Sequence, residues 1–216
     1  MSAEETISQI AKEVSVCTRC ALHEGRKKSV PGEGPANAEI MFIGEGPGFH
    51  ENEQGRPFVG AAGKFLDQLL AQAGVTRADV FIANVVKCRP PGNRDPLPEE
   101  LAACDTHLEA QIKAINPSII VTLGRFSMGK FVSGAKISAI HGQMRKVDDR
   151  FVIPMFHPAA ALHQAALKPA ILGDFAKLPE LLKQARSALG KNAVVEKKKK
   201  EEAPKQNEEP KQLSLF

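Results

Sequence analysis

Short apolar runs recur along most of the chain, and each is followed by a turn and a stretch with helical spacing. The runs at 38–43, 80–86 and 118–123 are apolar throughout, as is typical of strands buried on both faces. Further strands are predicted near 143–147 and 151–156, and helices near 3–15, 61–73, 99–115, 125–132, 158–166 and 174–189. Because such strands alternate with helices, the pattern predicts an α/β fold: a three-layer α/β/α sandwich with a central, mainly parallel sheet.

The segment from Gly44 to Gly60 follows the first predicted strand and is rich in glycine. We expect it to be irregular, with a helix beginning near Gly60. Ligands of parallel sheets bind beyond the carboxyl ends of the strands, where Asn84 and His157 also lie. Three separate segments are therefore predicted to meet at one pocket, although a glycine-rich connection without a ligand remains the alternative for this loop.

Two phosphate-binding motifs are excluded by the residues of this loop. Phe65 stands where a P-loop requires Ser or Thr, and Phe49 takes the third glycine position of the dinucleotide fingerprint. The loop instead carries Glu45, Glu51 and Phe58, which we expect to be exposed. These groups are suited to polar chemistry and to stacking on a flat ligand.

The four cysteines form one pattern: a Cys17-x2-Cys20 pair, then Cys88 and Cys104. With no signal peptide and no apolar run of membrane length, we expect a cytoplasmic protein, in which disulfides are rare. The pair then indicates a metal or cluster site. Four thiolates suit zinc or a [4Fe–4S] cluster, and the irregular spacing of the second couple favours the cluster. Four unrelated core cysteines are the alternative.

Composition adds few constraints. The 216 residues allow one sizeable core, and Trp and Tyr are both absent, so Phe must supply every aromatic contact. The net charge is +4, and half of it lies beyond residue 190, where seven lysines face five glutamates. Bulk charge therefore does not by itself indicate binding to nucleic acid.

Three motifs carry a family resemblance. The segments Gly44 to Gly60, Asn84 to Arg94 and Met155 to Ala159, with the cysteine quartet, are similar to those of family 4 uracil-DNA glycosylases over about residues 10–187. The resemblance implies a uracil-DNA glycosylase-like fold, a [4Fe–4S] cluster on Cys17, Cys20, Cys88 and Cys104, and hydrolysis of the N-glycosidic bond of deoxyuridine in DNA. The chain departs from the family at Asn52, where Asp is common, and at His163, where Arg is more familiar.

The resemblance also implies roles in reading uracil. A base must be extruded from the stack before an enzyme can act on it. Phe58 would stack on it, Asn84 would pair with uracil O4 and N3–H, and His157 would stabilise the negative charge that develops on O2. The predicted uracil-binding set is Gly44, Glu45, Gly46, Phe58, Asn84 and His157.

The remaining chemistry is expected from acids and amides. Glu45 and Glu51 are candidates to stabilise the sugar cation, to position water or to exclude a thymine methyl. Asn93 is a candidate to orient water or the flipped nucleotide. Gly46 stands where other uracil glycosylase families have a water-activating Asp, so no single base is expected. The predicted catalytic set is Glu45, Glu51, Asn93 and His157.

Predicted contacts to DNA come from the loops around the pocket. Arg89, Arg94 and the backbone near Ala159 would meet phosphates, and Leu162 would fill the vacated place in the stack, although it could instead pack in the core. We therefore expect a base-excision-repair enzyme that acts on uracil in single- or double-stranded DNA. The alternatives are a glycosylase for another deaminated base such as hypoxanthine, and a non-catalytic iron–sulfur DNA-binding factor.

The last residues differ in character from the rest. Residues 1–190 are predicted to form the glycosylase domain, 191–211 a charged, disordered linker, and 212–216 a docking peptide. The peptide is similar to the consensus by which bacterial proteins bind the DNA polymerase sliding clamp, through Gln212, Leu213, Leu215 and Phe216. Folding back onto the core is the alternative. We expect a monomeric bacterial protein of the cytoplasm, associated with the nucleoid.

Overall fold

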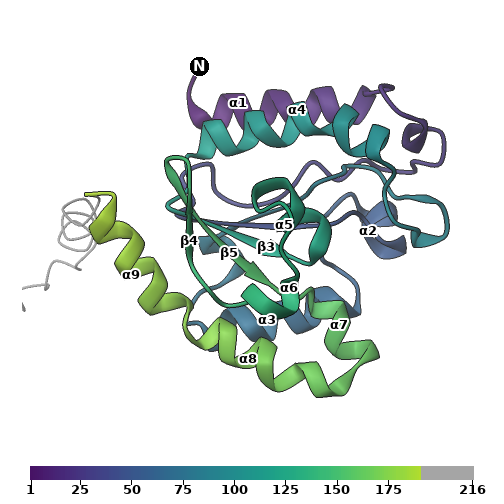
Figure 1. The fold of residues 1–216 in the computed structure, drawn as a ribbon. Helices are drawn as coiled ribbons and strands as arrows, with labels where there is room; N and C mark the ends of the chain where they lie inside the picture. The colour runs from purple at the N-terminus through teal and green to yellow at the C-terminus, as the bar shows by residue number, and fades with distance from the viewer. Residues whose placement is uncertain (191–216) are drawn as a thin grey trace, which may run out of the picture.

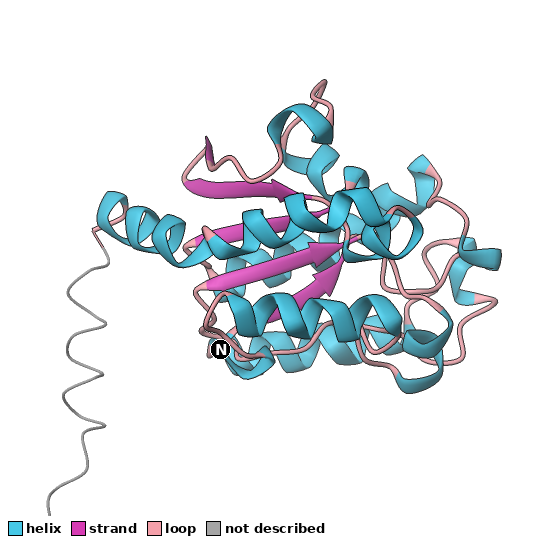
Figure 2. Cartoon of the chain, turned by 90° about the horizontal axis from the view of Figure 1, so that it is seen from below, coloured by secondary structure: helices cyan, strands magenta, loops and turns pink. Residues whose placement is uncertain are grey.

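The computed structural model describes residues 1–190, so the predicted linker and docking peptide lie outside the described residues and that division stays a prediction. A five-stranded sheet, ordered β2-β1-β3-β5-β4, crosses the molecule (Figures 1 and 2). Its strands are β1 (Ile40–Gly44), β2 (Phe81–Asn84), β3 (Ile119–Leu123), β4 (Arg145–Val147) and β5 (Arg150–Met155). β2, β1, β3 and β5 are parallel, and only the edge strand β4 is antiparallel.

Helices cover both faces of this sheet. They are α1 (Ala3–Val16), α2 (Phe49–Gln54), α3 (Ala61–Gln72), α4 (Pro98–Ile115), α5 (Arg125–Phe131), α6 (Ile137–Ile140), α7 (Pro158–His163), α8 (Lys168–Ala176) and α9 (Leu178–Ala188). Short 3₁₀ turns lie at η1 (Ala21–His23), η2 (Arg77–Asp79), η3 (Pro91–Asn93) and η4 (Ala165–Leu167). None of the helices within residues 1–190 is long and apolar enough to cross a membrane.

Alternate residues of each strand face opposite layers. On one face, Phe42, Val121 and Ile153 pack with residues of α3, α8 and α9, and the ring of Phe42 stacks on Phe175 at 5.9 Å. On the other, residues such as Met41 pack against α4, and Ile7 of α1 packs against the same cluster. Figure 1 shows α1 and α4 side by side over this face. β1, β2 and β3 are buried on both faces, which explains their continuous apolar runs. The predicted three-layer α/β/α sandwich is confirmed.

Two predicted regions differ from the structure. The loop after β1 is not wholly irregular, because it contains the short helix α2, which ends at Gly55 in a left-handed conformation. The helix predicted at 174–189 is instead the end of α8 followed by α9. Both helices carry a proline in their first turn, Pro169 and Pro179, where proline lacks only a hydrogen bond that the turn would not make.

Candidate active site

An open cavity of about 560 Å³ lies beyond the carboxyl ends of the parallel strands, where the α/β architecture predicts a ligand. It is bounded by the loop after β1 with α2, the start of α3, the end of β2, the η3 loop and α7. Predicted site residues that line it are Glu45, Gly46, Glu51, Phe58, Asn84, Asn93, Arg94, His157 and Ala159. The structure thus brings together the three segments that the sequence predicted to meet.

Asn84 ends β2 and is paired in register with Gly44 at the end of β1. Only 1% of Asn84 is exposed, yet within the described residues neither its Nδ2 nor its Oδ1 has a hydrogen-bond partner. A Cβ on Gly44 would lie 2.5 Å from that Oδ1 and 2.7 Å from Cζ of Phe58. Gly44 is therefore required as glycine to let these two side chains approach.

Phe58 is buried, with 6% exposure, so the expectation of an exposed ring is wrong. Its ring packs on that of His157, with centroids 5.4 Å apart and planes 24° apart. The backbone of Phe58 has φ 52°, a left-handed conformation that costs energy in a non-glycine residue. Such strain persists only where the surroundings enforce it.

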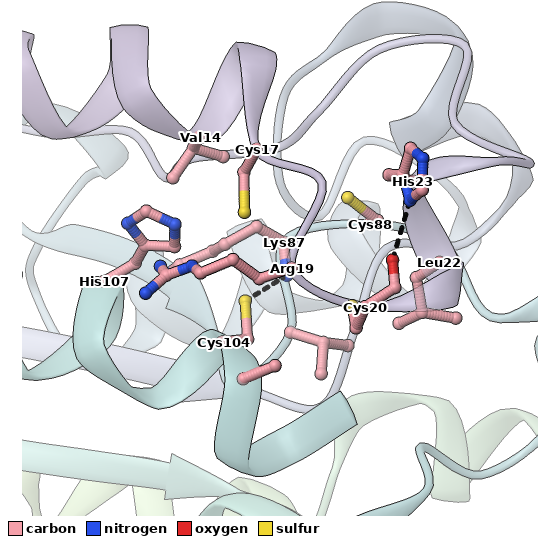
Figure 3. A pocket seen from close by; sticks show the side chains of 12 residues that line it. Val14, Cys17, Arg19, Cys20, Leu22, His23, Lys87, Cys88, Cys104 and His107 are labelled. Atoms are coloured by element: carbon pink, nitrogen blue, oxygen red, sulfur yellow. Dashed lines mark hydrogen bonds between the residues drawn. The ribbon is translucent and has the colours of Figure 1, made fainter. Parts of the chain in front are cut away.

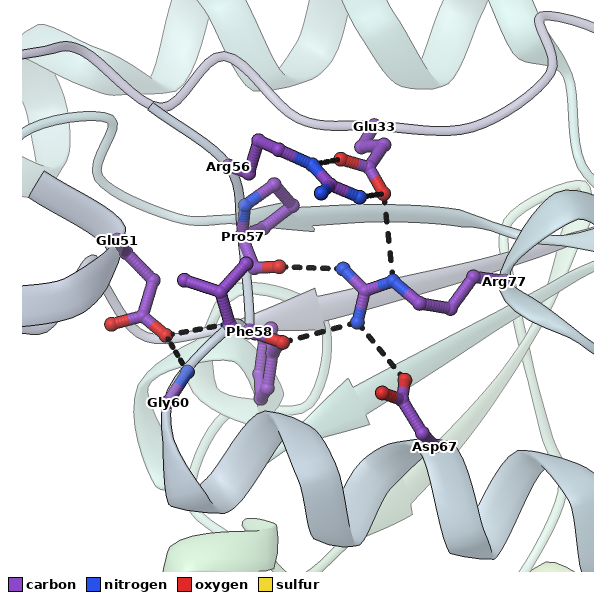
Figure 4. A network of polar contacts seen from close by, with 9 residues as sticks. Glu33, Glu51, Arg56, Pro57, Phe58, Gly60, Asp67 and Arg77 are labelled. Carbon is purple, nitrogen blue, oxygen red and sulfur yellow. Dashed lines mark hydrogen bonds and ion pairs between the residues drawn. The ribbon is translucent and has the colours of Figure 1, made fainter. Parts of the chain in front are cut away.

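Arg77 enforces this conformation, as Figure 4 shows. Its guanidinium donates to the carbonyl of Pro57 at 2.6 Å and to that of Phe58 at 3.1 Å. The same side chain pairs with Asp67 at 3.1 Å and Glu33 at 3.4 Å, so the fork is itself fixed. Arg77 could not be predicted from the sequence, because the two carbonyls that it binds lie about twenty residues away and no local motif marks it.

Glu51 holds the same loop from the other side. One carboxylate oxygen accepts from the N–H groups of Val59 at 2.8 Å and Gly60 at 3.0 Å (Figure 4). The other accepts from Gly48 N–H at 3.1 Å, at the start of α2. Glu51, a predicted candidate for stabilising the sugar cation, positioning water or excluding a thymine methyl, therefore binds backbone amides of two segments that line the cavity.

His157 follows β5 and precedes α7. Its Nδ1 accepts a hydrogen bond from Ala159 N–H at 3.1 Å, so the ring proton of the neutral form belongs on Nε2. Burial lowers the pKa of His157 to about 4, against a smaller opposing effect of the Glu51 charge. The imidazole is therefore neutral at pH 7 and is a donor through Nε2.

Glu45 and Gly46 follow β1 directly. Burial, and after it the charge of Asp95, raises the pKa of Glu45 above the usual range of a glutamate. A Cβ on Gly46 would lie 2.8 Å from Cγ2 of Val86, so a side chain here would need Val86 to move. Glu45 is thus an acid in the lining of the cavity, whereas position 46 has little room for a side chain.

The predicted DNA contacts have different surroundings. Arg89 lies outside the cavity lining and donates to Asn93 Oδ1 at 2.7 Å. Arg94 forms a two-point pair with the buried Glu100, at 2.9 and 2.6 Å, so its charge is already matched. Leu162 on α7 is 52% exposed, so the alternative that it packs in the core is wrong.

The four cysteines line a second, smaller cavity (Figure 3). Cys17 and Cys20 lie between α1 and η1, Cys88 follows β2, and Cys104 is on α4. Figure 3 shows the sulfur atoms of Cys17, Cys88 and Cys104 turned toward the space between them. Segments far apart in the sequence therefore present their thiols to one small volume.

Hydrogen-bond donors surround these thiols. Arg26 donates to Cys88 Sγ at 3.6 Å, and the N–H of Lys87 donates to Cys104 Sγ at 3.3 Å. His107 lines the same cavity, and its buried Nε2 has no hydrogen-bond partner among residues 1–190. An orphaned buried polar atom and inward thiols both fit a group that binds in this cavity.

A zinc ion and a [4Fe–4S] cluster require different arrangements of the four thiols. In residues 1–190, no three His, Cys, Asp or Glu side chains lie close enough together to hold one metal ion. Zinc needs its sulfur ligands about 2.3 Å from a single centre, whereas a [4Fe–4S] cluster is larger and takes its four thiolates at different irons. Four thiols that come from separate segments and line one cavity fit a cluster of this kind.

Comparison with known proteins agrees with this geometry. Residues 31–183 match the uracil DNA glycosylase superfamily. The chain is 45% identical over 186 residues to a type-4 uracil-DNA glycosylase of Thermotoga maritima, covering 84% of this chain and 97% of that protein. It is 44% identical over 188 residues to a type-4 uracil-DNA glycosylase of Archaeoglobus fulgidus, covering 82% and 94%. A type-5 uracil-DNA glycosylase of Pyrobaculum aerophilum is 32% identical over 150 residues, covering 61% and 66%.

Proposed function

The chain belongs to the uracil DNA glycosylase superfamily, as a type-4 uracil-DNA glycosylase of DNA repair, and from this premise we propose how its cavity performs the reaction. The enzyme hydrolyses the N-glycosidic bond of deoxyuridine in DNA, releasing uracil and leaving an abasic site. The extruded base enters the cavity, where Asn84 reads it, Phe58 packs against it, and His157 stabilises the departing anion.

The unpartnered amide of Asn84 supports this proposal most directly. Burying an amide without hydrogen bonds costs about 1–3 kcal/mol, so both of its polar atoms need a ligand. Uracil offers O4 to accept from Nδ2 and N3–H to donate to Oδ1. Cytosine presents the reverse pattern, with an amine at position 4 and no proton on N3. The same amide therefore selects uracil and rejects cytosine.

The leaving group is stabilised by a neutral donor. Cleavage leaves negative charge on the uracil ring, and Nε2–H of His157 donates to O2 as that charge develops. A neutral imidazole suits this task, because the bound base is also neutral before cleavage and the hydrogen bond strengthens only toward the transition state. The Ala159 N–H bond at 3.1 Å keeps the proton on Nε2 throughout.

Glu45 and Asn93 are assigned the stabilisation of the sugar cation and the orientation of the attacking water. A glycosidic bond that breaks in this way leaves an oxocarbenium-like sugar. The carboxylate of Glu45, once ionised, stabilises that cation and orients the attacking water together with Asn93, which also lines the cavity. We assign Glu51 a positioning role instead, because its oxygens bind the backbone of Gly48, Val59 and Gly60.

The cysteine cavity is proposed to hold a [4Fe–4S] cluster on Cys17, Cys20, Cys88 and Cys104. The cluster would connect the segment after α1 and the segment after β2 covalently to α4. Burial raises the pKa of Cys104 to about 11 and also raises that of Cys88, so these thiols need a metal to become thiolates. Burial also raises the pKa of Cys17, but hydrogen bonds and the charge of Arg19, then Arg26, lower it overall.

The finer statements about partners remain proposals. Uracil-containing DNA would meet Arg89, the backbone near Ala159 and Leu162 around the cavity mouth. Residues 212–216 are proposed to dock on the bacterial sliding clamp, which rests on their sequence alone. We also propose a monomer of the bacterial cytoplasm that acts at the nucleoid.

The substitution Asn84→Asp tests the proposed function. The carboxylate cannot donate to O4 and repels it, so we expect uracil release from an oligonucleotide to fall at least roughly 100-fold. Release is scored as strand scission at the abasic site after alkali. Asn52→Asp is the matched control, because it makes the same chemical change outside the cavity lining, where Oδ1 only accepts from Lys27 N–H.

The outcomes separate the alternatives. Wild-type release of uracil that Asn84→Asp loses and Asn52→Asp keeps supports the assignment. Release of hypoxanthine but not uracil by the wild type would indicate a different deaminated substrate. DNA binding without any base release would indicate a non-catalytic factor. Full uracil release by Asn84→Asp would place the reading amide elsewhere.

A further inference from the structure

Phe49 is a large aromatic side chain that the fold leaves in solvent. It is the first residue of α2, lines the cavity and is 53% exposed. Aromatic rings contribute most when buried, so an exposed ring at a cavity rim indicates a partner. The proposed reaction assigns no role to this ring.

The ring is held in place rather than loose. The guanidinium of Arg89 lies 5.3 Å from its centroid, in a cation–π contact, and the ring of His50 meets it edge-on at 5.5 Å. Arg89 in turn donates to Asn93 Oδ1, and Asn93 lines the cavity. Phe49 is therefore a fixed flat surface, coupled through two side chains to the active site.

An apolar ring beside a cation suits one kind of partner. Proteins bind unpaired nucleic acid by stacking bases on aromatic rings next to positive charges that meet the phosphates. Extruding a nucleotide leaves its neighbours without one stacking partner. Leu162, also half exposed, is on α7, and both α2 and α7 contribute residues to the lining of the cavity. Figure 1 shows these two helices at the same end of the molecule.

We propose that Phe49 stacks on the base adjacent to the extruded deoxyuridine, in the strand that carries the uracil. Leu162 would occupy the vacated position, and Phe49 would replace the stacking that the neighbouring base loses. This inference rests on the proposed function, because it needs the deoxyuridine in the cavity. It makes binding depend on the flat face of the ring and on the neighbouring base, and not on a paired second strand.

Binding to a single strand with an uncleavable 2′-fluorodeoxyuridine tests the stacking. We expect Phe49→Ala to bind about tenfold more weakly, within the range measured for base–aromatic stacking. Phe49→Leu should lose nearly as much, since it keeps an apolar side chain without a flat face, and Phe49→Trp should bind at least as well as the wild type. Gln184→Ala, on the exposed face of α9, is the control and should bind unchanged. Full affinity of Phe49→Leu would overturn the proposal.

Removing a neighbouring base locates the contact. If an abasic unit replaces the base on the stacked side, wild type and Phe49→Ala should bind equally; on the other side, the tenfold difference should persist. The chain has no Trp, so Phe49→Trp also supplies a single reporter, which stacking should quench and which Gln184→Trp should not reproduce. An equal Phe49→Ala loss with either abasic unit would overturn the stacking role. Uracil release by the wild type from strands of the same sequence that carry ordinary deoxyuridine shows separately whether the proposed function holds.

Discussion

Burial decides the charge of His157, and this has a consequence for stability. An unfolded histidine binds a proton below about pH 6.5, whereas folded His157 does so only near pH 4. Between these values the unfolded state holds more protons, so stability falls as the pH is lowered through this window. Across this window, the titration of His157 lowers the free energy of unfolding by about 3 kcal/mol.

Substitution of His157 by Gln should therefore flatten the acid side of the stability profile. Glutamine keeps a donor but does not titrate. We expect the free energy of unfolding, measured in urea, to fall less between pH 6.5 and 4.5 in His157→Gln than in the wild type. Other titrating groups contribute equally to both proteins, so identical slopes would contradict the neutral, buried imidazole.

The pKa of Glu45 is shifted in the opposite direction to that of His157. Its raised pKa means that it gains a proton at a higher pH than an ordinary glutamate, and the protonated acid cannot stabilise a sugar cation. The single-turnover rate of uracil release should therefore drop on the acid side, at a pH above the usual glutamate range. Glu45→Gln should lower the rate roughly 100-fold and remove that limb. A limb that persists in Glu45→Gln would assign it to another group.

Arg77 can be separated from its neighbour Arg56, because both pair with Glu33 but only Arg77 reaches the carbonyls of Pro57 and Phe58. Arg77→Ala should release the strained backbone of Phe58, slow uracil release at saturating DNA about tenfold, and speed hydrogen exchange at Val59 and Gly60. Arg56→Ala, an exposed pair, should do neither. Equal effects of the two changes would mean that the ion pairs alone matter.

The polar residues that line the cavity are easier to predict from the sequence than the residues that hold the loop of Phe58 in place. Asn84 and His157 could be predicted because each lies at or just beyond the carboxyl end of a strand, and parallel strands end at one edge. The left-handed, buried Phe58 could not be predicted, since its conformation is set by Arg77 and Glu51 through tertiary contacts. The same carboxylate of Glu51 suits catalysis or loop binding, and only the structure shows its amide partners.

At the scale of elements, the parallel strands were readily predicted, because burial on both faces makes them apolar throughout. The short helix α2 was not, since its start is set by the carboxylate of Glu51 returning to Gly48 N–H rather than by an apolar stripe. Pro169 and Pro179 mark the starts of α8 and α9 in the sequence, because proline favours the first turn of a helix.

The proposed cluster would join three segments that are far apart in the sequence: the one after α1, the one after β2, and α4. Protein purified without oxygen should contain four irons and four sulfides per chain and absorb broadly in the visible range. Cys104→Ser should lose this absorption and lower the melting temperature by several degrees. Since all four cysteines line one cavity, the chain offers no remote cysteine as a control. One zinc per chain, with no iron or sulfide, would overturn the cluster.

At the scale of the whole molecule, the two cavities share one segment. Asn84, which we propose reads the base, lines one cavity, and four residues later Cys88 lines the cysteine cavity. Between them the buried Lys87 donates through Nζ to the carbonyl of Asn84 at 3.0 Å and to Gln111 Oε1 at 2.6 Å on α4. Loosening the cysteine cavity should therefore disturb Asn84, although the cysteines lie outside the active cavity.

The docking peptide supplies the last prediction. Leu213, Leu215 and Phe216 are apolar residues at the end of a charged segment, and short motifs of this kind bind with micromolar affinity because they become ordered on docking. Deleting 212–216 should abolish binding to purified bacterial clamp and leave uracil release from oligonucleotides unchanged, because, within residues 1–190, the lining of the cavity comes from residues between 45 and 163. A scrambled peptide of the same composition is the control and should also fail to bind. Clamp binding that survives the deletion would refute the docking role, and lost uracil release would mean that these residues support the catalytic domain.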